Sequence, residues 1–587
     1  MHKKINLISF NLENIKKNVL GNLKKNQKIT LIGNWCQDSK KNGKIESLNF
    51  YKWNLKKERT KDDKKINNIY ENLLNQFSKN LNKIHKKDYP KKYWESLINR
   101  WLMAFIVDIY SKWQISEKII SRYKIKKFFY IKLNEKKFIP KNTFHHHNIH
   151  KNQNGHWSHY IFRKIMNYRL SKLNELEIST KKKIKYFSDT NFDHFNMLDK
   201  NIINFSLFKK IVLYNLSFDK KIIFHLKMKN FFLNIFFKNF TSKLSFKSKN
   251  LRYKFCGLFS TQKSNLENFL IKNIRLTFPK IFLENYEFLE QSYSNLKWPK
   301  NPDFILTTYG HYYDELFKIY CAKNLMNNSK LFIFQHGDGG IFADNDSYNI
   351  GWDKRICDKY FVWGKNPKNG YKSFFYTKKC LEKNRQFLSS KGGKILLIMY
   401  GLNEQPFRPI NGFNDNYETN KGLILNNKNF FSTLSPKIKR DINVKLLDNS
   451  KDKNVKKNLK KNLGKSVIIE ANQDYLKILD NYNLIVHFYL GTPFFESMLF
   501  NKPSIIILNK HFQLHFDKKF EIFVNKFMKN KIIFKSADEA GLFVNKNYYS
   551  IEKWWNSKKV QDTRREFCNM YCRHFEPKKD LINLLKI

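Results

Sequence analysis

The sequence is short of acidic residues and of cysteine. Its 587 residues include 50 Asp and Glu against 110 Lys and Arg, which leaves a formal net charge of +60. There are seven cysteines, an odd number, and no two of them form a Cys-x-x-Cys pair. A long chain with scattered cysteines does not fit a disulfide framework, so we expect a reducing compartment.

Long apolar runs are also missing. No stretch approaches the roughly 18 uncharged apolar residues that a membrane-spanning helix needs. The first residues, Met1–Ile5, lead into no apolar segment of the kind found in secretory signal peptides. The sequence therefore predicts a cytoplasmic protein, and its charge leaves open a peripheral contact with the inner membrane.

Three explanations compete for the excess of positive charge. Lysine is dispersed, and heavy use of Lys, Asn, Ile and Phe fits an AT-rich genome, so the surface can be basic without a binding role. An anionic membrane would attract such a surface, because each basic residue near it contributes about 1 kcal/mol. A specific nucleic-acid partner is not expected, since zinc-finger, RNP and helix-turn-helix signatures are absent.

The first half of the chain is harder to interpret than the second. Hydrophobic residues make up 42% of the sequence and aromatic residues 16%, enough for packed cores. A strand is predicted at Lys28–Cys36, a charged loop at about Lys40–Lys65, and helix from Ile66 to about Tyr123. Trp94, Leu97 and Trp101 fall on one face of that helix, and we interpret this face as core rather than as a membrane-binding surface.

From Pro302 onward, strands alternate with helices, a pattern typical of parallel sheets with right-handed crossovers. We predict an α/β protein with two Rossmann-like domains facing a cleft. Residues 1–390 would form the first, enlarged by helical insertions and serving the acceptor. Residues 391–587 would form the second, binding a donor nucleotide and ending in helices. The predicted strands are Pro302–Thr308, Lys330–Gln335, Lys359–Trp363, Lys394–Met399, Ile442–Leu447, Ser466–Glu470, Leu484–Tyr489 and Ser504–Leu508.

The first candidate site follows the apolar run Leu331–Phe334. Gln335, His336 and Gly337 come next, and Gly339 lies two residues further on. The carboxyl ends of parallel strands are where open α/β sheets bind ligands. A histidine there can carry a proton or contact a phosphate, and glycines let backbone N–H groups approach an anion. The alternative is a tight turn with a structural histidine.

A second candidate site follows the apolar segment that ends at Leu490. Gly491 and Thr492 lead into a predicted helix in which Glu496 and Ser497 occupy the second turn. A helix N-terminus carries partial positive charge and free N–H groups, which suit a phosphate. Thr492 could add a hydroxyl and Glu496 could accept hydrogen bonds from a ribose, although both side chains could instead only cap the helix.

A third candidate site lies after Thr308, where Asp314 and Glu315 could supply a general base or simply start a helix. The charges at Asp353–Asp358 are interpreted as structural. The single Asp-x-Asp motif, Asp344–Asp346, lies in a predicted loop. We therefore expect no metal and no other cofactor.

These pieces predict one scheme, in which the two glycine-containing corners bind a nucleotide-activated donor between the domains. His336 would contact the donor phosphate or act as general base on an acceptor hydroxyl. Thr492 and its helix would stabilise charge on the departing phosphate.

Several segments, in this order along the chain, resemble transferases encoded in bacterial O-antigen and capsule loci. These are relatives of the capsule polysaccharide and CDP-glycerol glycerophosphotransferase group. The matching segments are Gly33–Cys36, Tyr93–Trp101, Gln335–Gly339, Asp358–Gly364, Gly491–Ser497 and Trp554–Trp555. The resemblance implies a glycosyltransferase-B-like (GT-B) fold and transfer from a nucleotide-activated sugar or polyol phosphate. It also implies that His336 and Thr492 touch the donor.

The function predicted on this basis is transfer to a surface glycan, such as lipopolysaccharide O-antigen or capsule, or to its lipid-linked precursor. A non-catalytic protein that binds nucleotide sugars or glycans is the main alternative. A basic nucleic-acid-binding protein is a further one, suggested by charge alone.

Overall fold

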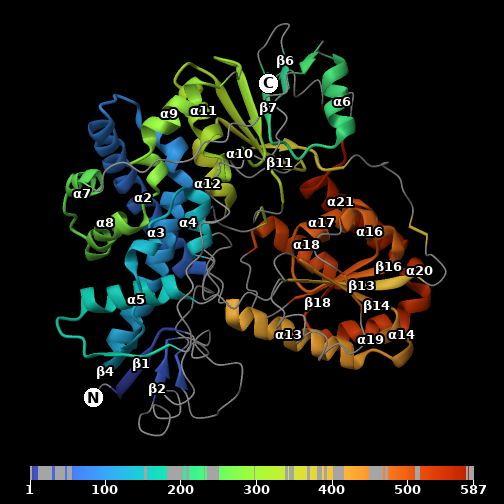
Figure 1. Cartoon of the computed structure of the whole chain (residues 1–587). Helices are drawn as coiled ribbons and strands as arrows, with labels where there is room; N and C mark the ends of the chain where they lie inside the picture. Colours follow the sequence, from blue (N-terminus) through green and yellow to red (C-terminus); the bar gives the residue numbers. More distant parts are fainter. Residues whose placement is uncertain are drawn as a thin grey trace.

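A computed structural model of the chain describes most of its residues. The described residues are 3–10, 29–32, 46–48, 56–150, 155–180, 203–205, 211–229, 232–234, 250–296, 298–337, 341–342, 349–365, 370–379, 387–388, 393–400, 416–447, 467–469, 474–508, 516–576 and 580. Three sheets organise these residues, and Figure 1 shows the N-terminal sheet at one end of the molecule and the other two stacked at its opposite side.

The N-terminal sheet has five parallel strands in the order β3-β2-β1-β4-β5. This is a doubly wound arrangement, because the chain begins in the middle and reverses direction between β1 and β4. The strands are β1 (Lys3–Ile8), β2 (Ile29–Leu31), β3 (Glu46–Ser47), β4 (Tyr123–Tyr130) and β5 (Glu175–Glu177).

The middle sheet has seven strands in the order β12-β11-β10-β9-β7-β6-β8. Five of them, from β12 to β7, are mutually parallel, and β6 runs antiparallel to both of its neighbours. The strands are β6 (Ile203–Phe205), β7 (Ile211–Tyr214), β8 (Phe232–Asn234), β9 (Phe304–Thr307), β10 (Lys330–Phe334), β11 (Lys359–Trp363) and β12 (Tyr371–Phe374).

The C-terminal sheet has six parallel strands in the order β15-β14-β13-β16-β17-β18. Counted from the first strand of this sheet the order is 3-2-1-4-5-6, the Rossmann order, with its reversal between β13 and β16. The strands are β13 (Lys394–Tyr400), β14 (Ile442–Leu447), β15 (Val467–Ile469), β16 (Tyr482–His487), β17 (Ser504–Ile507) and β18 (Ile533–Phe534).

Helices cover both faces of the C-terminal sheet. In Figure 1, α13, α14 and α19 lie on its outer face, whereas α16, α17, α18 and α21 lie between it and the middle sheet. Buried side chains from both sheets belong to one continuous core. The C-terminal helices are α13 (Asn416–Thr433), α14 (Pro436–Arg440), α16 (Tyr475–Ile478), α17 (Thr492–Leu499), α18 (Lys518–Lys529), α19 (Ala537–Asn547), α20 (Ile551–Trp555) and α21 (Lys558–Tyr571).

A layer of helices connects the N-terminal sheet with the middle sheet (Figure 1). Among the helices of the described residues, none combines the length and apolar character needed to cross a bilayer. The members of this half of the chain are α2 (Lys56–His85), α3 (Lys91–Arg122), α4 (Thr143–His150), α5 (His156–Arg169), α6 (Lys220–Lys229), α7 (Asn250–Gly257), α8 (Asn265–Thr277), α9 (Tyr286–Ser294), α10 (Gly310–Tyr313), α11 (Glu315–Leu325) and α12 (Asn349–Ile356).

The α/β architecture with two Rossmann-like sheets is confirmed, and the first half of the chain carries a sheet of its own in addition. The loop predicted at about 40–65 is wrong from Lys56, where α2 begins. The helical segment from Ile66 is two helices, because Pro90 lacks the N–H that a helix interior requires and instead precedes α3 as its N-cap. The predicted domain boundary near Ser390 lies outside the described residues.

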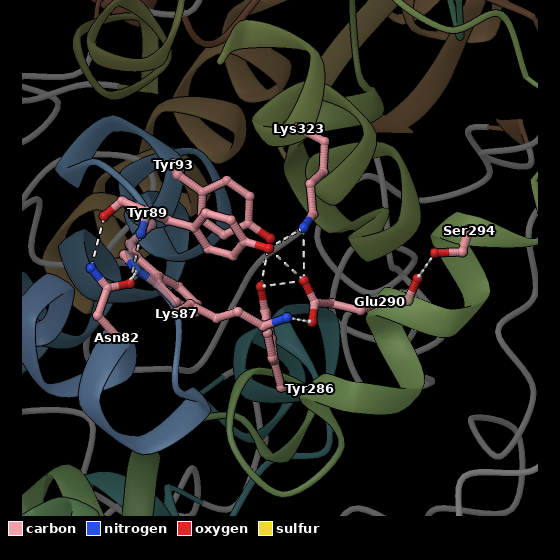
Figure 2. Close-up of polar contacts among 9 residues, drawn as sticks. Asn82, Lys87, Tyr89, Tyr93, Tyr286, Glu290, Ser294 and Lys323 are labelled. Atoms are coloured by element: carbon pink, nitrogen blue, oxygen red, sulfur yellow. Dashed lines mark hydrogen bonds and ion pairs between the residues drawn. The ribbon is translucent and has the colours of Figure 1, made fainter. Parts of the chain in front are cut away.

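A polar cluster fastens the turn between α2 and α3 to α9 and α11 (Figure 2). Glu290 receives hydrogen bonds from Tyr89 at 2.9 Å and Lys323 at 2.7 Å, and it pairs with Lys87 at 2.8 Å. Burial alone would raise the pKa of Glu290, but the hydrogen bonds from the two lysines outweigh it and lower this pKa to about 2. The carboxylate therefore stays charged and holds these helices together.

The end of α21 reaches back to the middle sheet. The backbone N–H of Lys365 donates to Asn569 O at 2.8 Å, and that of Tyr376 donates to Arg573 O at 2.9 Å. Gly364 has a φ of +111°, and a Cβ on it would lie 2.1 Å from Met570 O. Gly364 is thus required to be glycine, because α21 crosses the end of β11 at this point.

Candidate functional site

Gln335 fixes the turn that follows β10. Its side-chain Oε1 accepts a hydrogen bond from Trp363 N at 2.7 Å, and its Nε2 donates to Gly337 O at 2.6 Å. The side chain is buried, so both ends of its amide are paired inside the protein. Gln335 therefore acts by locking the turn to β11.

His336 is half-buried at the carboxyl end of β10, between two tyrosines that follow β9. Its ring lies 4.9 Å from the ring of Tyr309, and its Nδ1 lies 3.3 Å from the hydroxyl oxygen of Tyr312. Burial lowers the pKa of His336 to about 4, against the opposing effect of Asp353. The imidazole is thus neutral at pH 7, the state in which histidine can accept a proton.

The second corner is the start of α17, which directly follows β16. The N-cap is Gly491 rather than Thr492, and no side chain of the described residues caps this end of the helix. Thr492 is the first helical residue and Pro493 follows it, as expected for a residue without an N–H. The corner lies at the reversal between β13 and β16, where doubly wound sheets bind ligands.

The two corners meet. A Cβ placed on Gly337 would lie 2.9 Å from Thr492 Oγ1, which is closer than side chains normally approach. The turn after β10 in the middle sheet therefore touches the start of α17 in the C-terminal sheet. Only a residue without a side chain allows this approach, which gives Gly337 a steric reason to be glycine.

Glu496 lies one helical turn beyond Thr492 and is held from the middle sheet. Tyr376 donates a hydrogen bond to its Oε1 at 2.9 Å, and Lys378 Nζ lies 3.3 Å from the same oxygen. Oε2 has no hydrogen-bond partner among the described residues and remains able to accept a hydrogen bond. The charge of Lys378 also contributes to the lowered pKa of His336.

Ser497, on α17, is fully buried, and its hydrogen-bond partners lie on α16, α17 and β16. Its Oγ donates to Pro493 O at 2.9 Å, lies 2.5 Å from the Tyr475 hydroxyl, and lies 3.3 Å from His487 Nε2. These contacts hold the start of α17 against β16. The side chain of Ser497 thereby stabilises the position of the first turn of α17.

Asp314 and Glu315 make hydrogen bonds that lead away from His336. Asp314 is the N-cap of α11 and accepts from Phe317 N at 3.1 Å and from the Tyr214 hydroxyl. Glu315 accepts from Thr143 N at 2.8 Å and pairs with Lys318 at 2.9 Å. Asp314 starts α11, as the alternative interpretation of this segment predicted. These contacts do not support a general-base role for either Asp314 or Glu315.

Sequence reasoning missed the buried groups behind His336. Tyr312 donates to Asp353 Oδ2 at 3.0 Å, and Asp353 Oδ1 lies 3.0 Å from His311 Nε2 and 3.8 Å from Arg100 Nη1. All four of these side chains are buried. The sequence held one indication of this cluster, which is Arg100 next to the apolar face of α3. A buried arginine needs an acidic partner, so its position predicts a buried carboxylate nearby.

Two predicted features lie outside the described residues, namely Gly339 and the Asp344–Asp346 motif. Among the residues that the structure does describe, no three His, Cys, Asp or Glu side chains gather closely enough to hold a metal ion.

Comparison with known proteins gives the family. The model of the LIC12162 family transferases matches residues 18–585, nearly the whole chain. The chain belongs to this transferase family. A search of the curated proteins returns no match.

Solved structures similar to this LIC12162 family member align with it only loosely. A mutant of TarM from S. aureus, in complex with UDP, is 13% identical with a TM-score of 0.30, covering 52% of this chain and 59% of its own, which is under two thirds. Anabaena HepE in complex with UDP-glucose is 9% identical, at a TM-score of 0.32 over 54% of this chain and 88% of its own. MurG from Acinetobacter baumannii is 10% identical, with a TM-score of 0.29, covering 52% of this chain and 77% of its own.

The fold of this family member is GT-B-like on the evidence of its own topology. Two sheets with parallel Rossmann-like strands meet at their carboxyl ends, and α21 crosses from the second sheet to the first. The N-terminal sheet and its helices are additional to this pair.

Proposed function

We propose that the protein transfers a sugar or a polyol phosphate from a nucleotide-activated donor to a bacterial surface glycan or its lipid-linked precursor. The observation that supports this most is the contact between Gly337 and Thr492. It joins a neutral histidine on one sheet to a helix N-terminus on another. Together they offer a proton acceptor and a phosphate site side by side, which is what such a transfer requires.

Each residue of the proposed site has a role that fits its surroundings. The first turn of α17 and the Thr492 hydroxyl would bind the donor phosphate. Glu496, held by Tyr376 and Lys378, would accept hydrogen bonds from the ribose with its remaining oxygen. His336 would accept the proton of the attacking hydroxyl.

A thermal-shift screen against CMP, CDP, UDP, GDP, ADP and dTDP tests the donor site. A nucleotide at about 100 times its dissociation constant should stabilise the protein by about 2.7 kcal/mol. In Thr492→Ala we expect roughly tenfold weaker binding, because one hydrogen bond to a charged group contributes about 1.5 kcal/mol.

Thr433→Ala is the matched control, because Thr433 lies at the end of α13 on the outer face of the C-terminal sheet. Its nucleotide shift should equal that of the unchanged protein. A shift that survives in Thr492→Ala would place the nucleotide elsewhere. Binding with no turnover in the presence of glycan acceptors would favour the non-catalytic alternative.

Transfer is proposed to need no divalent metal ion. The N-terminus of α17 and the ammonium group of Lys378 supply positive charge at the place where the phosphate would lie. Turnover should therefore persist in excess EDTA. Its loss in EDTA, with recovery on adding Mg²⁺ or Mn²⁺, would contradict this part of the proposal.

A further inference from the structure

A chain of buried polar groups leads from His336 into the helical layer. Tyr312 comes from α10, Asp353 from α12 and Arg100 from α3. Tyr312 touches both His336 Nδ1, at 3.3 Å, and Asp353 Oδ2, at 3.0 Å. The three elements thus converge behind the histidine of the proposed site.

The direction of the hydrogen bonds follows from counting protons. A tyrosine hydroxyl has one proton to donate, and an ionised carboxylate can only accept. Burial and the charge of Asp353 raise the pKa of Tyr312 well above its usual range, so the hydroxyl keeps its proton. That proton points to Asp353, and the hydroxyl oxygen is left to accept a hydrogen bond from His336 Nδ1.

Asp353 has two basic side chains beside its Oδ1. The guanidinium of Arg100, which stays protonated in proteins, lies 3.8 Å from Oδ1, and His311 Nε2 lies 3.0 Å from the same atom. Arg100 is itself held over the ring of Tyr312, with 4.3 Å from its Cζ to the ring centroid. An aromatic face attracts a cation, so Arg100 is fixed next to the carboxylate.

The Nε2 side of the His336 ring differs from the Nδ1 side, which contacts Tyr312. Nε2 forms no hydrogen bond with the described residues, and the side chain is half-buried rather than enclosed. The groups that face the ring are Tyr309 and Tyr312, and the nearby charges are Asp353, Lys378 and Arg100, with His311 as a further titratable group.

We propose that Asp353, acting through Tyr312, holds neutral His336 in the tautomer with hydrogen on Nδ1, so that Nε2 presents its lone pair to the acceptor hydroxyl. This inference rests on the proposed function and names Tyr312 and Asp353 as positioning residues. In the transfer step the hydroxyl proton moves to Nε2 while its oxygen bonds to the transferred group. The bond to the nucleotide breaks, and the nucleotide leaves with the electron pair.

The proton gained by His336 is also accommodated by this arrangement. The imidazolium keeps its Nδ1–H bond to Tyr312, and the negative charge of Asp353 lies one residue further along the chain of hydrogen bonds. A third group that orients and stabilises the base is the general logic of an activated histidine.

The tautomer can be measured directly in the resting protein. In protein labelled with ¹⁵N-histidine, the signals lost in His336→Gln identify the two ring nitrogens. Their couplings to the ring protons distinguish Nδ1 from Nε2. We expect a protonated Nδ1 and a bare Nε2 at pH 7. A protonated Nε2 would overturn the proposal.

Asp353→Asn should reverse the tautomer. The amide of asparagine can donate to the Tyr312 oxygen, and the hydroxyl proton then turns toward Nδ1. His336 would become protonated at Nε2 and lose its function as base, with kcat lower by at least tenfold and the donor KM little changed. An unchanged ¹⁵N pattern in this variant would overturn the proposal.

Tyr312→Phe provides a second variant if Asp353→Asn fails to fold. Without the hydroxyl the tautomer should become mixed, and kcat should fall by about tenfold, the change produced by about 1.4 kcal/mol. The matched control is Tyr320→Phe on α11, which removes a hydroxyl bonded to Pro299 O. This control should leave the His336 signals unchanged.

The proposed function and the inference about His336 can fail independently of each other. If no nucleotide is turned over but the ¹⁵N pattern is as expected, the proposed function fails and the arrangement of His336 stands. If transfer occurs with a protonated Nε2, the function stands and the inference about Asp353 and Tyr312 is overturned.

Discussion

Two histidines at the carboxyl ends of parallel strands show how differently the same position can be used. His159 lies at the reversal between β1 and β4, where its Nε2 accepts from Ile131 N at 3.2 Å and its Nδ1 lies 2.6 Å from Ser9 Oγ. It is completely buried. His336, after β10, forms one side-chain hydrogen bond with the described residues and is half-buried.

The strand order of a doubly wound sheet creates a position at its carboxyl edge where a ligand can bind. The side chains at that position decide whether it is accessible to a ligand. In the N-terminal sheet, one imidazole ties the ends of β1 and β4 together, with both nitrogens engaged. At the junction of the other two sheets, one nitrogen is engaged and a helix N-terminus lies beside it. Among the described residues, the histidines at the two positions therefore differ in their bonding.

The largest effect expected from either histidine is on turnover. His336→Ala should lower kcat/KM for donor and acceptor by about 10²- to 10⁴-fold, the usual contribution of a general base. The circular dichroism spectrum and unfolding temperature should stay close to those of the unchanged protein. Near-native turnover in this variant would remove His336 from the mechanism and erase its difference from His159.

The reverse outcome is expected for His159→Ala, which should lower stability rather than turnover. Removing a buried ring that bonds to Ile131 and Ser9 leaves a cavity and an unpaired backbone N–H, at a cost of about 3 kcal/mol. The midpoint of the first calorimetric transition should fall. Turnover measured well below that midpoint should be preserved, and a loss of turnover in fully folded protein would contradict the distinction.

Acid should weaken the N-terminal sheet through His159. Burial lowers its pKa to about 3, while in the unfolded chain it titrates near 6.5. Below about pH 6.5 the unfolded state therefore binds a proton that the folded state does not. Unfolding becomes easier by about 1.4 kcal/mol per pH unit as the pH falls toward 3.

His159→Phe should remove one proton from this pH dependence. The check is the slope of the first unfolding midpoint between pH 6 and pH 4.5, compared in both proteins. Equal slopes would show that His159 is not the neutral, enclosed group described above.

The smallest effect is expected from the helical layer that carries Arg100 toward His336. Glu290→Gln removes the charge that pairs with Lys87 and Lys323, and should cost about 1 kcal/mol because the cluster is partly exposed. The pKa of Glu290 is lowered to about 2, so this contribution should be lost only as the pH falls below about 4.5. Chemical denaturation should show a smaller difference between the two proteins at pH 3 than at pH 7, because at pH 3 the unfolded carboxyl is protonated while the folded one is still largely ionised.

Sequence reasoning worked best where strands are buried on both faces. The strands from Lys330 and Lys359 were located to within a residue, because continuous apolar runs ended by polar residues leave little choice. The strand from Ile442 was located as well, although Asn443 and Lys445 alternate with its apolar residues. It missed β1, whose first two residues are exposed lysines, and β18, which is two residues long. Neither gives a recognisable run.

The candidate site could be predicted only as far as single segments allow. The turns at Gln335–Gly337 and Gly491–Thr492 each follow a strand, and their placement on facing sheets was expected. Asp353 and Lys378 belong to segments without a motif, so nothing in their own sequence neighbourhood points to His336 or Glu496. Such pairings are set by tertiary packing, which brings distant residues together and leaves no local pattern.

The crossing of α21 onto the end of β11 sets the order in which the protein can mature. Gly364 and its contact at Met570 are separated by about 200 residues, roughly 10 to 40 s of synthesis at about 5–20 residues per second. During that interval the end of β11, the strand next to β10, lacks the helix that crosses it. The contact between α21 and the middle sheet can therefore form only after the ribosome has finished α21.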